Sequence, residues 1–254
     1  MNITFLGTGT SHGVPVAGCS CGTCLSDDPR DRRYRSSVFI EEKGAALLID
    51  TPAEFRLASL SAGINRIDAV LLTHAHADHV AGFDDIRRYN ELSGMSMPVY
   101  SSAATLYELR KRFGYIFEST QEGGGKPKVV LFEVGHGKAF ECSGISVTPI
   151  RVMHGETEVM AFRAGGFAYV TDVSYIPQDS IELLRGLDVL VLDALRPEPH
   201  PTHFNLETAV RTAGLLAAKR TFFTHIAHRL KHEETEKKLP KGMFLAYDGL
   251  KVES

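Results

Sequence analysis

The sequence predicts an α/β fold in which two β-sheets form a sandwich. Short runs of β-branched and aromatic residues recur along the 254 residues and alternate with helix-like segments. Several of these predicted strands are followed directly by His or Asp, and strand ends are where ligand clefts form in α/β sheets. A chain of this length with 43% hydrophobic residues can bury a core without disulfides.

Composition limits the classes of partner. The formal net charge is −3, so no overall basic field attracts nucleic acid or an anionic membrane, although a large RNA substrate is only disfavoured. No apolar stretch has the length of a membrane span. The N-terminus enters a strand directly, with no leader pattern, and we expect a cytoplasmic protein. No linker or repeat divides residues 1–254, so we expect one domain.

The first strand is predicted over residues 3–6, followed by the glycine-rich turn 7–11. This turn lacks the Lys-Ser/Thr of a nucleotide-binding loop, and a structural turn is favoured over an anion site. It places His12 at the cleft rim, where a rim or packing role is favoured over metal ligation.

Cys19, Cys21 and Cys24 follow within six residues. Three thiols this close match part of a structural zinc site, which is normally four-coordinate, so one ligand is missing locally. The alternative is three unrelated cysteines. Metal binding is favoured because exposed clustered thiols are otherwise prone to oxidation.

A hairpin is predicted from residues 37–41 and 45–49, and Asp50 ends its second strand. This carboxylate can orient a ligand imidazole or cap the helix predicted over 53–62. The two roles are compatible.

The main motif follows the apolar strand 69–72. His74, His76, Asp78 and His79 lie within six residues, at the point where a strand ends and the chain turns. Imidazole and carboxylate are the usual ligands of zinc and related metals. Four ligands from one segment exceed the needs of one ion, so the pattern indicates two metals, each taking one pair. A histidine-rich polar turn is the disfavoured alternative.

The middle of the chain continues with a helix at 83–92, a strand at 98–101 and a helix at 103–112. Residues 113–127 then break the pattern with three aromatics and the triple glycine 123–125. This composition is as consistent with a mobile flap over a cleft as with a flexible surface connection.

The second half is rich in predicted strands, at 129–134, 145–151, 159–163, 167–171, 188–192, 220–224 and 246–250. Helices are expected at 180–185, 205–218 and 231–238. His154, Asp172 and His225 come at or near strand ends. Each alone fits a capping or core role, but together with the main motif they favour a metal site.

This set of motifs resembles the metallo-β-lactamase superfamily of hydrolases, and most closely its PhnP-like branch of phosphoribosyl cyclic phosphodiesterases. The resemblance implies an αββα sandwich of two packed mixed sheets flanked by helices. It implies that His74, His76 and His154 hold one metal, that Asp78, His79 and His225 hold the other, and that Asp172 bridges them.

The resemblance also implies a structural zinc in which His228 is the fourth ligand beside the three cysteines. His203 matches the family's histidine at the substrate phosphate. The expected catalytic residues are therefore His203, Asp172 and Asp78, with two Zn or Mn ions and a metal-activated hydroxide that attacks a small cyclic or linear phosphodiester.

Three alternatives follow from the same motif. A tRNA 3′-processing endoribonuclease is expected to carry an extended basic arm, which the sequence lacks. A lactone or thioester hydrolase would use the same metals on a carbonyl. A non-enzymatic metal-binding protein is disfavoured because all seven expected ligands are present.

We expect a small-molecule phosphodiester as the substrate and no membrane partner. Nucleic acid is disfavoured, and a homodimer is compatible with the sequence.

Overall fold

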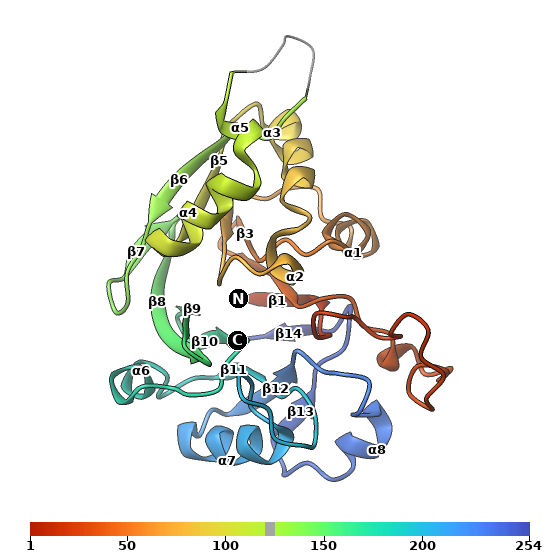
Figure 1. The fold of residues 1–254 in the computed structure, drawn as a ribbon. Coiled ribbons are helices and arrows are strands. Elements are labelled where there is room, and N and C mark those ends of the chain that lie inside the picture. The colour runs from red at the N-terminus through yellow and green to blue at the C-terminus, as the bar shows by residue number, and fades with distance from the viewer. Residues whose placement is uncertain (120–124) are drawn as a thin grey trace.

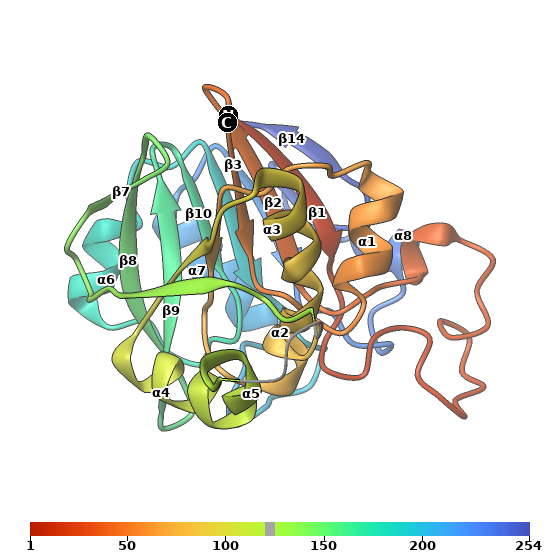
Figure 2. The same cartoon turned by 90° about the horizontal axis from the view of Figure 1, so that it is seen from above.

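The fold, a computed structural model that describes residues 1–119 and 125–254, contains two mixed seven-stranded sheets packed face to face (Figures 1 and 2). The first sheet runs in the order β14 (Lys251–Glu253), β1 (Asn2–Gly7), β2 (Ser37–Glu42), β3 (Ala45–Ile49), β4 (Ala69–Leu71), β5 (Met97–Ser101) and β6 (Val129–Glu133). The second runs in the order β13 (Met243–Leu245), β12 (Arg220–Thr224), β11 (Val189–Asp193), β10 (Phe167–Val170), β9 (Thr157–Ala164), β8 (Ile145–His154) and β7 (Phe140–Cys142).

Both faces of the central strands are buried, as the continuous apolar runs predict. In β11, Val189 and Val191 face the core between the sheets, whereas Leu190 and Leu192 face the core under the helices of the second sheet. This alternation follows from the two-residue period of a strand. Each fully buried aliphatic side chain contributes about 2 kcal/mol by leaving water.

Helices cover the two outer faces (Figure 1). The first sheet carries α1 (Phe55–Ala62), α3 (Arg87–Ser93) and α4 (Ala103–Arg112), and the second carries α6 (Gln178–Leu183) and α7 (Leu206–Leu216). The shorter helical segments are η1 (Pro29–Asp31), α2 (Ala77–Val80), η2 (Phe83–Ile86), α5 (Gly114–Phe117) and α8 (His232–Glu236). The predicted αββα sandwich is confirmed.

Some boundaries differ from the prediction. The helix expected at 53–62 begins at Phe55 with Glu54 as its N-cap, so Asp50 is not its cap. The helix expected at 83–92 starts as the 3₁₀ turn η2. The short edge strands β7, β13 and β14 were not predicted, since three residues give no clear period.

The strand expected at 246–250 is wrong, because this segment is the crossing between β13 and β14, which lie in different sheets. Its polar contacts explain the turn. The carboxylate of Asp248 accepts hydrogen bonds from Thr8 Oγ1 at 2.8 Å and from the backbone N–H of Tyr34 at 2.6 Å.

Part of the segment 113–127 packs on the helical layer. The rings of Phe113 and Phe83 lie 5.4 Å apart between centroids, and Ile116 is buried in the same core. Gly123 and Gly124 of the predicted flap lie outside the described residues, so the flap remains a prediction.

The backbone of the glycine-rich turn after β1 packs closely against the backbone around Arg35. A Cβ on Gly7 would lie 1.9 Å from the carbonyl oxygen of Arg35, which excludes any side chain there. Gly9 bridges Ile226, and the N–H of Thr10 donates to Ile226 O at 3.2 Å. The turn therefore joins the end of β1 to the end of β12 in the other sheet.

A buried arginine supports this junction. Arg33, 2% exposed, donates from Nη1 to Thr8 Oγ1 at 2.8 Å and to Ala246 O at 2.5 Å. Its Nη2 donates to Nδ1 of buried His232 at 3.0 Å. Burial, reinforced by the Arg33 charge, lowers the pKa of His232 to about 4.

This arrangement predicts acid sensitivity. The pKa of His232 is about 4 in the folded state and about 6.5 in the unfolded state. The unfolded state therefore binds more protons below about pH 6.5, and stability falls as the pH falls toward 4. Between pH 7 and 5 this one group removes about 1–2 kcal/mol. Urea unfolding of wild type and His232→Gln at pH 7 and pH 5 measures the free energy of unfolding. The variant should lack the loss of stability that His232 causes between these two pH values.

The matched control is His12→Gln, since His12 is exposed. It should keep the full pH dependence of the wild type. An equally steep loss of stability in His232→Gln would contradict the assignment.

Candidate metal-binding site

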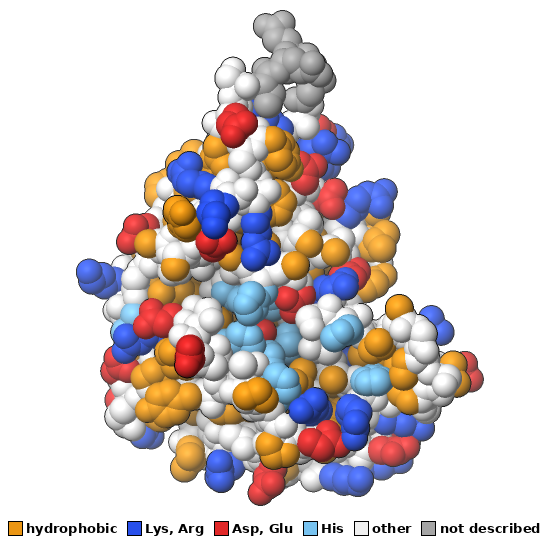
Figure 3. All heavy atoms as spheres, in the orientation of Figure 1, with side chains coloured by type: hydrophobic (Ala, Val, Ile, Leu, Met, Phe, Trp, Pro, Cys, Tyr) orange, Lys and Arg blue, Asp and Glu red, His pale blue; other side chains and the backbone are white. Residues whose placement is uncertain are grey.

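Histidine and carboxylate side chains gather where strand ends of both sheets meet. Figure 3 shows the histidines in a hollow near the middle of the molecule, at the level of α2 in Figure 1. The residues that follow or end strands here are Asp50 (β3), His74 and His76 (β4), His154 (β8), Asp172 (β10), Asp193 (β11) and His225 (β12), with Asp78 and His79 on α2.

One half of the predicted dinuclear site is a compact group of donors. One donor atom each from Asp78, His79, Asp172 and His225 lie within 4.8 Å of one another. His79 Nε2 is 3.1 Å from Asp172 Oδ2 and 3.4 Å from Asp78 Oδ2. His225 Nε2 is 3.3 Å from Asp172 Oδ1. Asp172 thus faces both imidazoles, as expected of a shared ligand.

The other predicted half lies beside it. His74 Nε2 is 2.9 Å from His76 Nδ1, and the ring centroids of His76 and His154 are 5.3 Å apart. His154 and Asp172 also form a donor group with His203. The structure therefore places all seven predicted ligands around Asp172.

The charges and unpartnered atoms of this group fit divalent cations. Within the described ranges, the Nε2 atoms of His79 and His225 are buried and have no hydrogen-bond partner. Asp172, 2% exposed, is a buried carboxylate that needs a cationic partner. The N/O donor set is the one zinc, manganese and related metals prefer.

The pKa values of the metal-free protein lead to the same conclusion. Burial lowers the pKa of His225, but Asp172 and Asp78 outweigh it and raise the value to about 9. Burial likewise opposes charge on His79, while Asp172 and Asp50 raise its pKa well above the usual value. Protons thus supply the positive charge that bound cations would supply.

Neighbouring groups orient the ligand imidazoles. His79 Nδ1 donates to Asp50 Oδ2 at 2.7 Å, and Asp50 also accepts from the N–H and the hydroxyl of Thr73, each at 2.8 Å. His154 Nδ1 donates to the carbonyl of Thr202 at 2.7 Å. Each bond fixes the ring and leaves Nε2 directed at the cluster.

Backbone strain is concentrated at the same place. Among the described residues, six non-glycine residues have a positive φ, and three of them are Asp50 (62°), Asp172 (53°) and His225 (60°). Such conformations cost of order 1–3 kcal/mol each and persist where the surroundings enforce them. They turn these side chains into the cluster directly at the strand ends.

Asp193 was not predicted as a site residue. It accepts from His203 Nδ1 at 2.9 Å and from the N–H of Val173 at 3.1 Å, and its Oδ1 lies 3.7 Å from His225 Nδ1. The available signal was the same as for Asp172, namely a carboxylate at the end of a buried parallel strand.

The cysteine cluster forms a second group of donors. The Sγ atoms of Cys19, Cys21 and Cys24 lie 3.3, 3.4 and 3.5 Å from Nδ1 of His228. All four donor atoms lie within 4.8 Å of one another. The backbone N–H of Cys24 lowers the pKa of Cys21 to about 6, which favours the thiolate that a metal requires. The set fits a tetrahedral ion.

A family model for the β-lactamase superfamily domain matches residues 46–226. The chain belongs to the metallo-β-lactamase superfamily. Its PhnP-like character is supported by a crystal structure of a new diphosphatase from the PhnP family, which is 47% identical with a TM-score of 0.92 over 99% of this chain and 96% of that one. The chain therefore forms a domain of the metal-dependent hydrolase type, and this fold binds divalent metal ions.

Two curated relatives extend the comparison. An octanoyltransferase of Porphyromonas gingivalis is 37% identical over 99% of this chain and 51% of its own length. A ribonuclease Z of Bradyrhizobium diazoefficiens is 27% identical over 63% of this chain and 48% of its own length. The chain thus spans about half the length of these two relatives.

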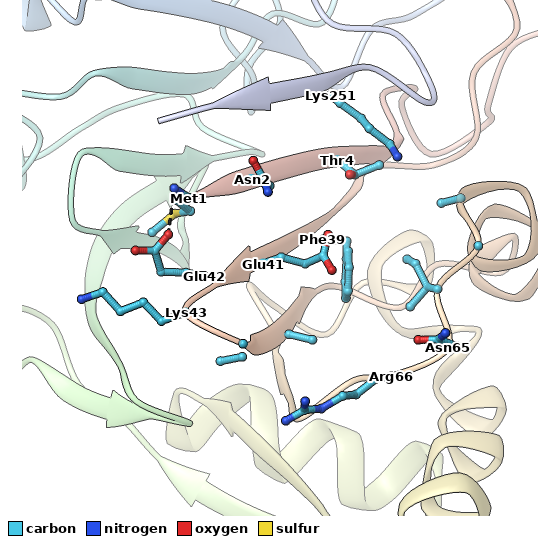
Figure 4. A pocket seen from close by; sticks show the side chains of 16 residues that line it. Met1, Asn2, Thr4, Phe39, Glu41, Glu42, Lys43, Asn65, Arg66 and Lys251 are labelled. Carbon is cyan, nitrogen blue, oxygen red and sulfur yellow. Dashed lines mark ion pairs between the residues drawn. The ribbon is translucent and has the colours of Figure 1, made fainter.

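One further hollow in the described part of the chain lacks these metal-binding side chains. A hollow of about 460 Å³ lies on the outer face of β1–β3 and is lined by residues such as Thr4, Phe39 and Glu41, with no histidine or cysteine (Figure 4). None of the helices in the described ranges is long and apolar enough to cross a membrane.

Asp50→Asn tests the orienting role of the carboxylate. The amide is a weaker hydrogen-bond acceptor for His79 Nδ1–H than a carboxylate, so the affinity for a metal ion bound at His79 should fall about 10–100-fold. Competition with a chromophoric chelator measures it. Asp68→Asn is the control, because Asp68 also accepts a backbone N–H in this sheet, from Ala46 at 2.8 Å. Equal metal affinity in Asp50→Asn and wild type would refute the role.

Cys21→Ser tests the cysteine group. Loss of one thiolate should remove one equivalent of bound zinc and lower the melting temperature by about 5 °C or more, because zinc binding stabilises the folded loop. Elemental analysis and thermal unfolding provide the readouts. Ser20→Ala, at an exposed neighbouring position, is the control. A variant that keeps both its zinc and its melting temperature would disprove a structural metal.

Proposed function

We propose that this hydrolase is a dinuclear phosphodiesterase that cleaves a small cyclic or linear phosphodiester. The observation that carries the proposal is His203 beside the cluster. Its donor atom lies within 4.8 Å of donors of His154 and Asp172, and its ring stacks on His225 at a centroid distance of 4.7 Å. The 47% identity to a diphosphatase of the PhnP family supports chemistry at phosphorus.

The residues divide into two ligand sets. One ion would be held by His74, His76 and His154. The other would be held by Asp78, His79 and His225, and Asp172 would contact both ions. When bound, two divalent ions supply Lewis-acid stabilisation of negative charge and lower the pKa of water toward neutrality. Asp172 stays ionised, since burial alone would raise its pKa but His225 and His79 lower it well below the usual value. It serves as a ligand, not as a base.

His203 is placed to handle the substrate. Its Nδ1 donates to Asp193 Oδ2 at 2.9 Å, and Asp193 is fully buried, so the ring has a fixed orientation. This leaves Nε2 for the ligand. When protonated, Nε2 donates to a phosphate oxygen and gives its proton to the leaving alkoxide as the P–O bond breaks, while water supplies the new oxygen on phosphorus.

A tRNA 3′-processing endoribonuclease is the second candidate. The similarity to ribonuclease Z supports it. The net charge of −3 opposes it, because phosphate contacts dominate affinity for nucleic acid. The cysteine group would in either case hold a structural zinc.

His203→Ala tests the proposal. Loss of the proton donor should lower kcat about 10²–10⁴-fold on a 2′,3′-cyclic nucleotide, whose leaving alkoxide needs a proton, while the catalytic metal content stays unchanged. The rate on bis(p-nitrophenyl) phosphate should fall much less, because p-nitrophenolate leaves without a proton. His136→Ala, a histidine on a surface turn that contacts Asp179, is the control and should keep wild-type rates. Loss of metal together with activity would show that His203 is a ligand and not a donor. Faster cleavage of a 3′-extended pre-tRNA than of small diesters would favour the second candidate.

A further inference from the structure

The cysteine group lies at the surface of the molecule. Its three cysteines are each partly exposed, whereas the remaining cysteine, Cys142, is fully buried. The loop that carries the group, residues 15–27, extends away from the two sheets and is drawn in red in Figures 1 and 2. We propose that the group is an oxidation site, in which a hydroperoxide joins Cys21 and Cys24 in a disulfide, expels the structural ion and detaches the loop. The proposal rests on the structural metal and not on the phosphodiesterase activity.

Cys21 and Cys24 share one turn of the loop. The N–H of Leu25 donates to the carbonyl of Cys21 at 3.0 Å. Residues three apart on such a turn lie on the same side of it, and the two sulfur atoms lie within 4.8 Å of each other. A disulfide requires them to approach to about 2.05 Å. A Cβ on Gly22, between the two cysteines, would meet nothing within 4 Å, so the turn has room to tighten.

The reaction balances with hydrogen peroxide as the oxidant. One thiolate attacks a peroxide oxygen, the O–O bond breaks, and a sulfenic acid and a hydroxide ion form. The second thiolate attacks the sulfenic sulfur, the S–S bond forms, and a second hydroxide leaves. The two sulfur atoms together lose two electrons, and the peroxide gains them. Cysteine binds a metal as the thiolate, which is also the form that attacks a peroxide, so the ligands are themselves reactive.

The disulfide removes two of the four donors of the group. Cys19 and His228 remain, which are too few for a four-coordinate structural zinc, so the ion leaves. Within the described ranges, the hydrogen bonds that join the loop 15–27 to distant parts of the chain run from its sulfur atoms to Nδ1 of His228, at 3.3, 3.4 and 3.5 Å. Its backbone hydrogen bonds stay inside the loop. Oxidation therefore breaks the polar connection between the loop and the body of the protein.

The loop also borders the cleft of the proposed reaction. Val16 of the loop and His203 line the same hollow, of about 380 Å³. On the other side of the group, His228 follows the predicted metal ligand His225 by three residues. Detachment of the loop therefore changes a wall of the cleft and the anchor of a segment that carries a metal ligand. This couples the oxidation state of the cysteines to the dinuclear site.

Hydrogen peroxide added to the zinc-loaded protein tests the site. Oxidation should release one equivalent of zinc to a chromophoric chelator and remove two of the four thiols, with a disulfide between Cys21 and Cys24 in the peptide map. Dithiothreitol and zinc should restore the starting state. Cys142→Ala is the control and should respond as wild type does, because Cys142 is buried. Zinc that stays bound, or zinc that leaves without this disulfide, overturns the proposal.

Cys24→His separates oxidation from a weak metal site. An imidazole can replace the thiolate as a zinc ligand, but it cannot form the disulfide, so peroxide should release zinc much more slowly than from wild type. Equally fast release from this variant contradicts the assigned pair.

Hydrogen exchange of the wild-type protein tests the loop without any variant. Amide exchange in residues 15–27 should rise on oxidation and return on reduction with zinc, while exchange in α7 stays unchanged. Equal exchange of the loop in the oxidised and reduced proteins overturns its detachment. None of these readouts uses hydrolysis, so they stand even if the phosphodiesterase proposal fails.

Discussion

The buried carboxylate of Asp172 is the constraint on which the site depends. A carboxylate that is 2% exposed is stable only if positive charge lies close to it. His79 and His225 supply that charge when protonated. His79 donates to a second buried acid, Asp50, at 2.7 Å, and His225 Nδ1 lies 3.7 Å from a third, Asp193. The centre therefore contains more acids than a metal-free fold has reason to bury. Bound cations would balance this excess of negative charge.

The fold brings this cluster together through parallel strands. In the second sheet, β10, β11 and β12 are parallel neighbours, so their carboxyl ends meet at one edge. Asp172, Asp193 and His225 lie at these ends, and the positive φ of Asp172 and His225 turns the chain there. The first sheet contributes the equivalent edge of β3 and β4. Backbone bonds such as Met160 N–H to Thr73 O, at 3.0 Å, tie the two edges together.

Much of this arrangement was predictable from the sequence. The central strands were anticipated because fully buried strands give continuous apolar runs, and the residues at their ends stood out chemically, whereas the short edge strands β7, β13 and β14 were missed. The crossing at 246–250 was missed because Ala246, Tyr247 and Leu250 suggest a strand, whereas Asp248 and its bonds to Thr8 and Tyr34 decide the structure. Asp193 was missed for a related reason. Its role depends on a hydrogen bond from His203, ten residues further on, and no local sequence pattern predicts that hydrogen bond.

One short segment after β12 connects the different sites. His225 belongs to the dinuclear cluster and His228 to the cysteine group. Ile226 between them is fully buried and is bonded to the turn after β1 through Thr8 and Thr10. A movement of the cysteine loop would therefore displace His225 of the cluster as well. An ion held by the cysteine group would stabilise more than its own loop, since His228 and His225 lie on the same short segment.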